Sequence, residues 1–257
     1  ATEHSSILRH SDADQIDIIP VNHDGIIDCT ALDKKLSETS PALVSIMLAN
    51  NETGIIQPIG EIAALCRQYG AWLHTDAVQA LGKIPLDFTA LGVDMMTISA
   101  HKMGGAVGAA ALVVRQNIPL LPLIRGGGQE LGRRAGTENI ASIVSFAKAV
   151  ECIDLESMKN LRGWVDTMEQ TIIGAGGGVI RHPSSDNRLP NTSCLIMPGV
   201  SSEVQLMHFD LQSIAISAGS ACSSGRIEPS HVLLAMGISP DIAGCAIRIS
   251  GGWASQK

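Results

Sequence analysis

Apolar positions in the first half of the chain alternate between strand-like runs and helix-like spacing. Four short apolar runs predict strands, and they cover residues 42–49, 71–75, 93–99 and 109–114, of which the first and third are expected to be buried. Residues 59–69 instead have apolar side chains at helical spacing, and this pattern stops at Gly70. The alternation of strands and helices predicts an α/β fold with a mostly parallel sheet flanked by helices.

The pattern changes near residue 150. Helical spacing occupies roughly residues 139–173, and the glycine-rich run 174–178 marks a turn or boundary. Beyond it, short strands are predicted near residues 179–181, 192–197 and 214–217, with a helix near 201–211. We therefore expect a large domain over residues 1–150 and a smaller α+β domain over residues 151–257.

Composition narrows the class of protein. The chain has 257 residues, of which 45% are hydrophobic, and a formal net charge of -7, which argues against a nucleic-acid-binding surface. No apolar run reaches the roughly 18–20 residues that span a bilayer, and the first residues show no signal-peptide pattern. Six cysteines are widely spread without a Cys-x-x-Cys pair. Reduced thiols in a cytoplasmic protein fit this spacing better than disulfides or a metal site.

Polar residues follow three of the predicted strands. Asn51, Asp76 and Lys102 each come at or just after a strand's carboxyl end. Ligands of parallel α/β sheets bind beyond these ends, so we expect the three residues to converge on one cleft.

Lys102 suggests a specific chemistry. A lysine at the end of a buried strand is costly unless its charge is paired or removed. One use for such an amine is a Schiff base with a carbonyl cofactor, of which pyridoxal phosphate is the commonest. The alternative is a lysine that simply begins a loop.

Residues near Lys102 and Asp76 could hold such a cofactor. Asp76 could pair with a protonated pyridine nitrogen, and Gln79 could donate to the ring's phenolic oxygen. Ser99 and His101 could bind a phosphate group. The competing interpretations are a helix-capping aspartate and a histidine with a structural role.

Three further features remain ambiguous on their own. The glycine-rich segment 126–139 contains cationic and hydroxyl groups suited to an anion, but such loops are common. Cys222 lies among small polar residues, where an exposed and reactive thiol is expected, whereas Cys66 and Cys194 are expected to be inert packing. Arg248, within an apolar run, needs an anionic partner, which could be a substrate carboxylate or a structural ion pair.

Together these segments resemble the cysteine desulfurases of the class V aminotransferase family, of the NifS/IscS type. The matching motifs occur in the family's order along nearly the whole chain: Thr2-Glu3-His4, residues 21–28, Asn50-Asn51-Glu52-Thr53-Gly54, residues 74–79, Ser99-Ala100-His101-Lys102, residues 126–130, 134–139, 217–222 and 247–250. The resemblance implies the fold of the fold-type I pyridoxal-phosphate-dependent transferases.

The resemblance also implies a role for each site residue. Lys102 would hold pyridoxal phosphate, and Cys222 would accept sulfur as the nucleophile. The other implied roles are ring stacking and proton transfer by His4, ring-nitrogen pairing by Asp76, ring-oxygen contact by Gln79, phosphate binding by Ser99, His101 and the partner subunit's Thr137, and substrate-carboxylate binding by Asn51 and Arg248.

The implied reaction converts L-cysteine to L-alanine and leaves a persulfide on the enzyme. A homodimer would hand the sulfur to an acceptor, such as an iron–sulfur scaffold protein or a tRNA-modifying sulfur carrier. Two alternatives stay open: a lyase acting on selenocysteine or cysteine sulfinate, and a catalytically silent fragment that serves as a scaffold or binding module.

The sequence also departs from the family pattern. It shows no counterpart of the family's phosphate-gripping turn before Thr2 or of the terminal helix after Arg248. Ala100, Gly105, Ala106 and Leu131 replace residues that are usual in the family. We therefore expect weakened cofactor affinity or a cofactor-free protein.

Overall fold

Four strands form the first sheet of the protein. The computed structural model describes residues 1–9, 16–39, 43–219 and 228–255. The sheet has the order β1 (Leu43–Met47), β2 (Trp72–Asp76), β3 (Met95–Ser99) and β4 (Ala110–Val114). The first three strands pair in parallel, which confirms the mostly parallel sheet, and β4 pairs antiparallel with β3. The connection between β3 and β4 is shorter than the dozen or so residues that a parallel crossover needs.

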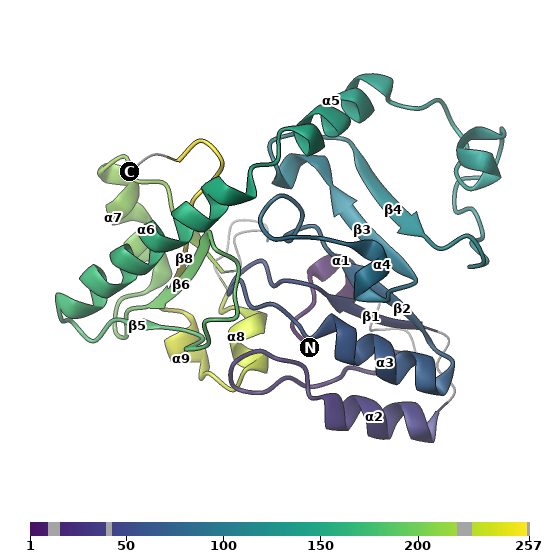
Figure 1. Cartoon of the computed structure of the whole chain (residues 1–257). Helices are drawn as coiled ribbons and strands as arrows, with labels where there is room; N and C mark the ends of the chain where they lie inside the picture. Colours follow the sequence, from purple (N-terminus) through teal and green to yellow (C-terminus); the bar gives the residue numbers. More distant parts are fainter. Residues whose placement is uncertain (10–15, 40–42, 220–227, 256–257) are drawn as a thin grey trace.

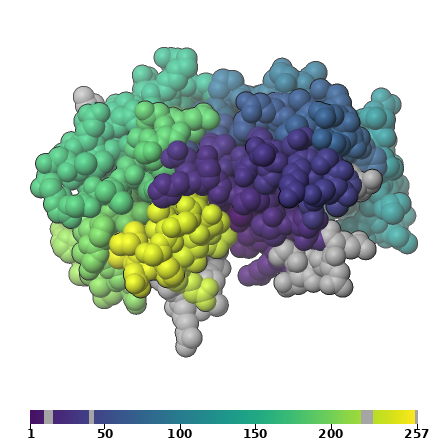
Figure 2. Space-filling model, turned by 90° about the horizontal axis from the view of Figure 1, so that it is seen from below, coloured from purple at the N-terminus to yellow at the C-terminus, as the bar shows by residue number. Residues whose placement is uncertain are grey.

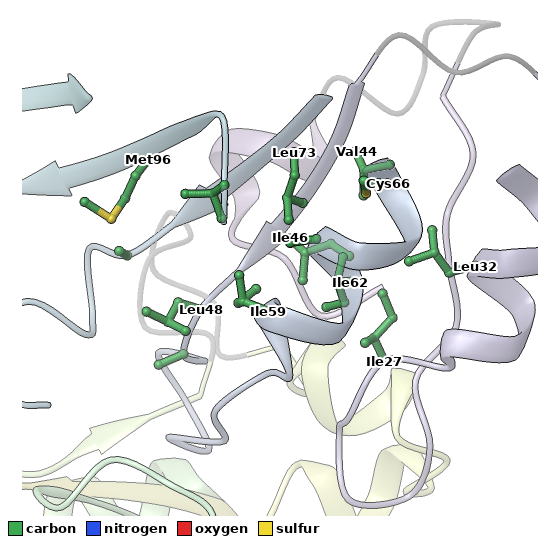
Figure 3. Packing of buried hydrophobic residues seen from close by; sticks show 14 of the residues in the cluster. Ile27, Leu32, Val44, Ile46, Leu48, Ile59, Ile62, Cys66, Leu73 and Met96 are labelled. Carbon is green, nitrogen blue, oxygen red and sulfur yellow. The ribbon is translucent and has the colours of Figure 1, made fainter. Parts of the chain in front are cut away.

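Helices cover the first sheet and enclose its core. The helices that contribute to this core are α2 (Cys29–Glu38), α3 (Ile59–Tyr69) and α4 (Phe88–Leu91), whereas α1 (Ser5–Leu8) buries no residue. Helix α3 has the predicted bounds, buries Ile62 and Cys66, and ends at Gly70, whose φ of 70° favours glycine. Figure 3 shows how its side chains pack with Leu73 of β2 and with Leu32 of α2.

The second sheet is antiparallel and lies in the other half of the molecule (Figure 1). Its order is β5 (Ile180–Arg181), β6 (Thr192–Ile196), β8 (Ala246–Ser250) and β7 (Ser217–Ala218). Helices α6 (Leu155–Gly174) and α7 (Ser202–Leu211) pack on it, and α8 (His231–Ala235) and α9 (Pro240–Ala243) lie beside it. The second half of the chain thus combines an antiparallel sheet with helices.

The helical stretch expected over residues 139–173 is two helices, α5 (Ile140–Glu151) and α6. Asp154 separates them, because its carboxylate accepts hydrogen bonds from Glu156 N at 3.0 Å and Ser157 N at 3.1 Å and so begins a new helix. Within the described residues, the 3₁₀ turn η1 (Ala100–Lys102) follows β3, and the turn η2 (Gln129–Gly132), in which Glu130 and Leu131 have positive φ, precedes α5.

The N-terminal segment joins the two halves. Figure 2 shows it lying directly against the C-terminal part of the chain. Val21 packs with the cluster that includes Val232, and His23 Nδ1 lies 3.1 Å from the carbonyl oxygen of Met236. Within the described residues, no helix is both long enough and apolar enough to cross a bilayer.

Candidate active site

The site begins at the carboxyl edge of the first sheet. Because β1, β2 and β3 run parallel, their carboxyl ends share one edge, and Asp76 is paired there with Met47 of β1 and Thr97 of β3. Asn51 and Lys102 follow β1 and β3 at the same edge. The structure therefore confirms that the three polar positions lie at one edge of the sheet.

Lys102 is exposed, which corrects the expectation that it ends a buried strand. Strand β3 stops at Ser99, and the turn η1 takes the next residues beyond the edge of the sheet. Across the residues that the structure describes, the Lys102 amine has no hydrogen bond or ion pair. The amine is thus available to a ligand because it is exposed and has no partner, and not because burial removes its charge.

Asp76, the last residue of β2, and Gln79, on the turn that follows it, are both half-buried. Asp76 Oδ1 accepts a hydrogen bond from Val78 N at 2.9 Å, so the aspartate does shape the turn, as the capping alternative supposed. Its second oxygen has no hydrogen bond within the described part of the chain. The carboxylate can therefore stabilise the turn and still accept from a ligand.

Lys83 is the member of this site that sequence reasoning missed. Its Nζ donates to Gln79 Oε1 at 2.6 Å. Burial, reinforced by the charges of Lys102 and Arg248, lowers the pKa of Lys83 to about 8. The expected burial of a lysine therefore applies to Lys83 and not to Lys102. The sequence signal for Lys83 is its spacing of four residues from Gln79.

Ser99 and His101 contact each other across the start of η1. Ser99 Oγ lies 2.8 Å from His101 Nδ1; the serine is buried and the histidine is exposed. The pair brings a hydroxyl and an imidazole together beside Lys102, which suits a phosphate.

Arg248 of β8 joins the second sheet to the loop after β1. Its Nη1 donates to the main-chain carbonyl of Asn51 at 2.8 Å. Its Nε is buried and has no hydrogen-bond partner in the described structure, and no described carboxylate lies within 4.0 Å of its guanidinium. The buried Nε can therefore donate a hydrogen bond to an anionic ligand. The positive charge of Arg248 also lowers the pKa of nearby Glu52.

Glu52 is a buried residue of this loop. Burial raises the pKa of Glu52, while the hydrogen bond from Ser230 Oγ and the charges of His231 and Arg248 lower it. Asn50 Oδ1 accepts from the main-chain nitrogens of Glu52 at 2.8 Å and Thr53 at 2.9 Å. These contacts fix the loop that places Asn51 beside Arg248.

Three predicted residues remain, His4, Thr137 and Cys222, and His4 directly follows Glu3, whose carboxyl is close enough to Asp76 for their charges to interact. His4 is exposed and caps α1, with its Nδ1 accepting from Ser6 N at 3.2 Å. Thr137 is exposed on the segment between β4 and α5, which extends away from both sheets (Figure 1). Cys222 lies outside the described residues. Cys66 and Cys194 are buried as expected, and burial raises the pKa of their thiols to about 11 and about 12.

A cleft of about 670 Å³ opens beside the two lysines. Lys83 and Lys102 line it on the side of the first sheet, with Ser157 of α6 and Trp253 on the other side. Trp253 packs against Gly104, where a Cβ would lie 2.9 Å from the indole Nε1. The cleft reaches both lysines, but Asp76, Gln79, Ser99 and His101 are not among the residues that line it.

The sequence profile described as Aminotransferase class-V matches residues 1–257. The chain therefore belongs to the class V aminotransferase family, and its fold is that of the fold-type I pyridoxal-phosphate-dependent transferases. An X-ray structure of a NifS-like protein from Rickettsia africae has a TM-score of 0.90 and 36% identity, and the match covers 99% of this chain and 69% of that one.

Curated relatives are named cysteine desulfurases. The IscS enzyme of Dictyoglomus turgidum is 40% identical over 246 residues, which cover 95% of this chain and 62% of that protein. A cysteine desulfurase of Cereibacter sphaeroides is 44% identical over 237 residues, covering 90% and 60%. The chain thus spans about three-fifths of the length of these relatives.

The donor set fits pyridoxal phosphate, the cofactor implied by the family. A partner-free amine can bind an aldehyde, a carboxylate with one unused oxygen can pair with a protonated ring nitrogen, and the Gln79 amide can donate to a ring oxygen. The hydroxyl and imidazole of Ser99 and His101 suit the phosphate. Lys102, Asp76, Gln79, Ser99 and His101 would therefore hold the group.

Proposed function

We propose that the protein is a pyridoxal-phosphate-dependent cysteine desulfurase, which converts L-cysteine to L-alanine and keeps the sulfur as a persulfide. The observation that carries the proposal is the partner-free amine of Lys102 at the carboxyl edge of three parallel strands, with Asp76 on the neighbouring strand. The cysteine desulfurases named among its relatives support the substrate.

The bound cofactor would supply an electron sink for the substrate's Cα. Lys102 would hold the cofactor and, once displaced by the substrate amine, would take the Cα proton. Asp76 would keep the ring nitrogen protonated. Arg248, with its buried and unpartnered Nε, would bind the substrate carboxylate beside Asn51.

Cys222 would accept the sulfur in this proposal. Its thiolate attacks the substrate sulfur, so an S–S bond forms as the C–S bond breaks, and the organic product becomes alanine after protonation. His4 would carry protons between the thiols. The persulfide would then pass its sulfur to an acceptor such as an iron–sulfur scaffold protein, in the cytoplasm.

A second copy of this chain would complete the site. Helix α5 has no buried residue, and the segment before it presents Leu123 at 97% exposure and Leu131 at 94%. Large apolar side chains this exposed on one segment are typical of a surface that binds a partner. Pairing two copies through it would cover the surface and bring Thr137 of the partner subunit toward the phosphate. We also propose that the two halves, residues 1–150 and 151–257, are separate domains.

The experiment adds pyridoxal phosphate to the purified protein and then L-cysteine. We expect a visible absorption band on cofactor binding, followed by alanine and, with a thiol reductant, sulfide. Lys102→Ala should lose the band and both products, and Cys222→Ser should keep the band and lose the persulfide. A wild-type protein that shows neither the band nor the products would refute the proposal.

A further inference from the structure

Lys83 makes a hydrogen bond that determines which atoms of the Gln79 amide remain free to bind a ligand. The two residues lie on the segment that follows β2, and the ammonium nitrogen is 2.6 Å from Gln79 Oε1. Lys83 is half-buried and lines the same cleft as Lys102.

The chemistry of the two groups fixes the orientation of the amide. An ammonium group has donors only, whereas a glutamine amide has one acceptor oxygen and one donor nitrogen. The pKa of Lys83 is lowered to about 8, so the amine is still mostly protonated at pH 7. Lys83 therefore holds the oxygen of Gln79, and the amide NH₂ is left for another acceptor; within the described residues no acceptor takes it.

We propose that Lys83 is a positioning residue, which fixes the Gln79 amide so that its NH₂ group faces the ring oxygen of pyridoxal phosphate. The proposal rests on the proposed function for the identity of the ligand. Without Lys83 the amide can rotate, and either its oxygen or its nitrogen can face the ligand. An amide oxygen facing a phenolate oxygen would be repulsive.

Lys83 could instead act only through its charge. The nearby positive charges of Lys102 and Arg248 each lower the pKa of Lys83, so the three cations interact electrostatically. The other charged groups that line the cleft are Lys148 and Asp154. A double-mutant cycle separates the two explanations, because an effect transmitted through Gln79 disappears when Gln79 is removed, whereas a charge effect does not.

The first experiment measures the dissociation constant of pyridoxal phosphate and the absorption spectrum of the bound cofactor. Lys83→Met should weaken binding roughly twofold to tenfold, the range of one hydrogen bond, and should shift the visible band. In a Gln79→Ala background the same change should have no further effect. Lys83→Arg, which also has donors only, should restore the wild-type band.

The matched control is Lys148→Met, which removes a second cleft-lining lysine that pairs with Glu151 at 3.0 Å and does not contact Gln79. It should leave the band unchanged. Equal losses from Lys83→Met with and without Gln79, or no loss at all, would overturn the positioning role.

A second measurement needs no cofactor. In the ligand-free protein, the side-chain amide resonances of Gln79 should shift in Lys83→Met and stay in place in Lys148→Met. Unchanged resonances in both variants would refute the contact itself. If wild-type protein fails to bind pyridoxal phosphate, the proposed function fails, and this measurement still decides whether Lys83 orients the amide.

Discussion

The buried carboxyl of Glu3 makes a quantitative prediction about pH. Glu3 is 8% exposed, its Oε1 accepts from Met47 N at 2.8 Å, and its Oε2 is buried with no hydrogen-bond partner in the described structure. Burial, with a smaller contribution from Asp76, raises the pKa of Glu3 from 4.5 to about 7, against the opposing effect of the Met47 hydrogen bond.

A carboxyl group with a raised folded-state pKa holds its proton more tightly in the folded protein. Its contribution to stability is therefore complete below the unfolded-state pKa of 4.5 and is lost as the pH rises to about 7. With these two pKa values, linkage gives a loss of about 2.5 kcal/mol in the free energy of unfolding between pH 5 and pH 8. Glu3→Gln removes the titration and keeps an oxygen for Met47 N.

The assay is urea unfolding of the wild type and of Glu3→Gln at pH 5 and pH 8. The difference between the two proteins isolates Glu3, because their other titrating groups are the same. We expect the variant to be more stable relative to wild type at pH 8 than at pH 5 by about 2.5 kcal/mol. Glu38→Gln, which removes an exposed carboxylate at the end of α2, is the control, and its stability difference from wild type should be the same at both pH values. The same result for Glu3→Gln would refute the reasoning.

Three further predictions concern the core, the apolar surface and a close approach. Ile62→Ala, at a fully buried position, should lower the free energy of unfolding in urea by about 2–5 kcal/mol, and a loss below about 1 kcal/mol would contradict its place in the core. Leu123→Asp combined with Leu131→Asp should convert a dimer to a monomer in sedimentation experiments, whereas an unchanged dimer would place the interface elsewhere. Gly219→Ala should cost about 1–3 kcal/mol in thermal unfolding, because its Cβ would lie 2.6 Å from Glu52 Oε2; wild-type stability would show that the carboxylate can move.

The elements of the fold were largely predictable because hydrophobic periodicity is a local property. Helix α3 and the strands of both sheets follow from short apolar patterns and from residues such as Gly70 that end them. The break between α5 and α6 was missed, because Asp154 caps a helix inside a continuous helical pattern. The antiparallel direction of β4 depends on the length of the connection before it, which periodicity does not show.

The candidate site was predictable where it depends on strand order. Asn51, Asp76 and Lys102 were found because parallel strands end at one edge. The exposure of Lys102 was not predicted, because the sequence does not show where the chain turns away from the sheet. Lys83 was missed because its burial and the nearby charge of Arg248 arise from tertiary structure, which a local sequence pattern does not show. Motif resemblance supplied the roles that geometry alone leaves open.

The central claim is that Lys102 is the amine that holds the cofactor. The direct measurement is to incubate the protein with pyridoxal phosphate, reduce it with borohydride to fix the cofactor to the amine, and map the labelled peptide by mass spectrometry. Lys83, whose lowered pKa makes it the competing nucleophile in the same cleft, provides the internal comparison. The account predicts a label on Lys102, and a label on Lys83 instead, or on no lysine, would contradict it.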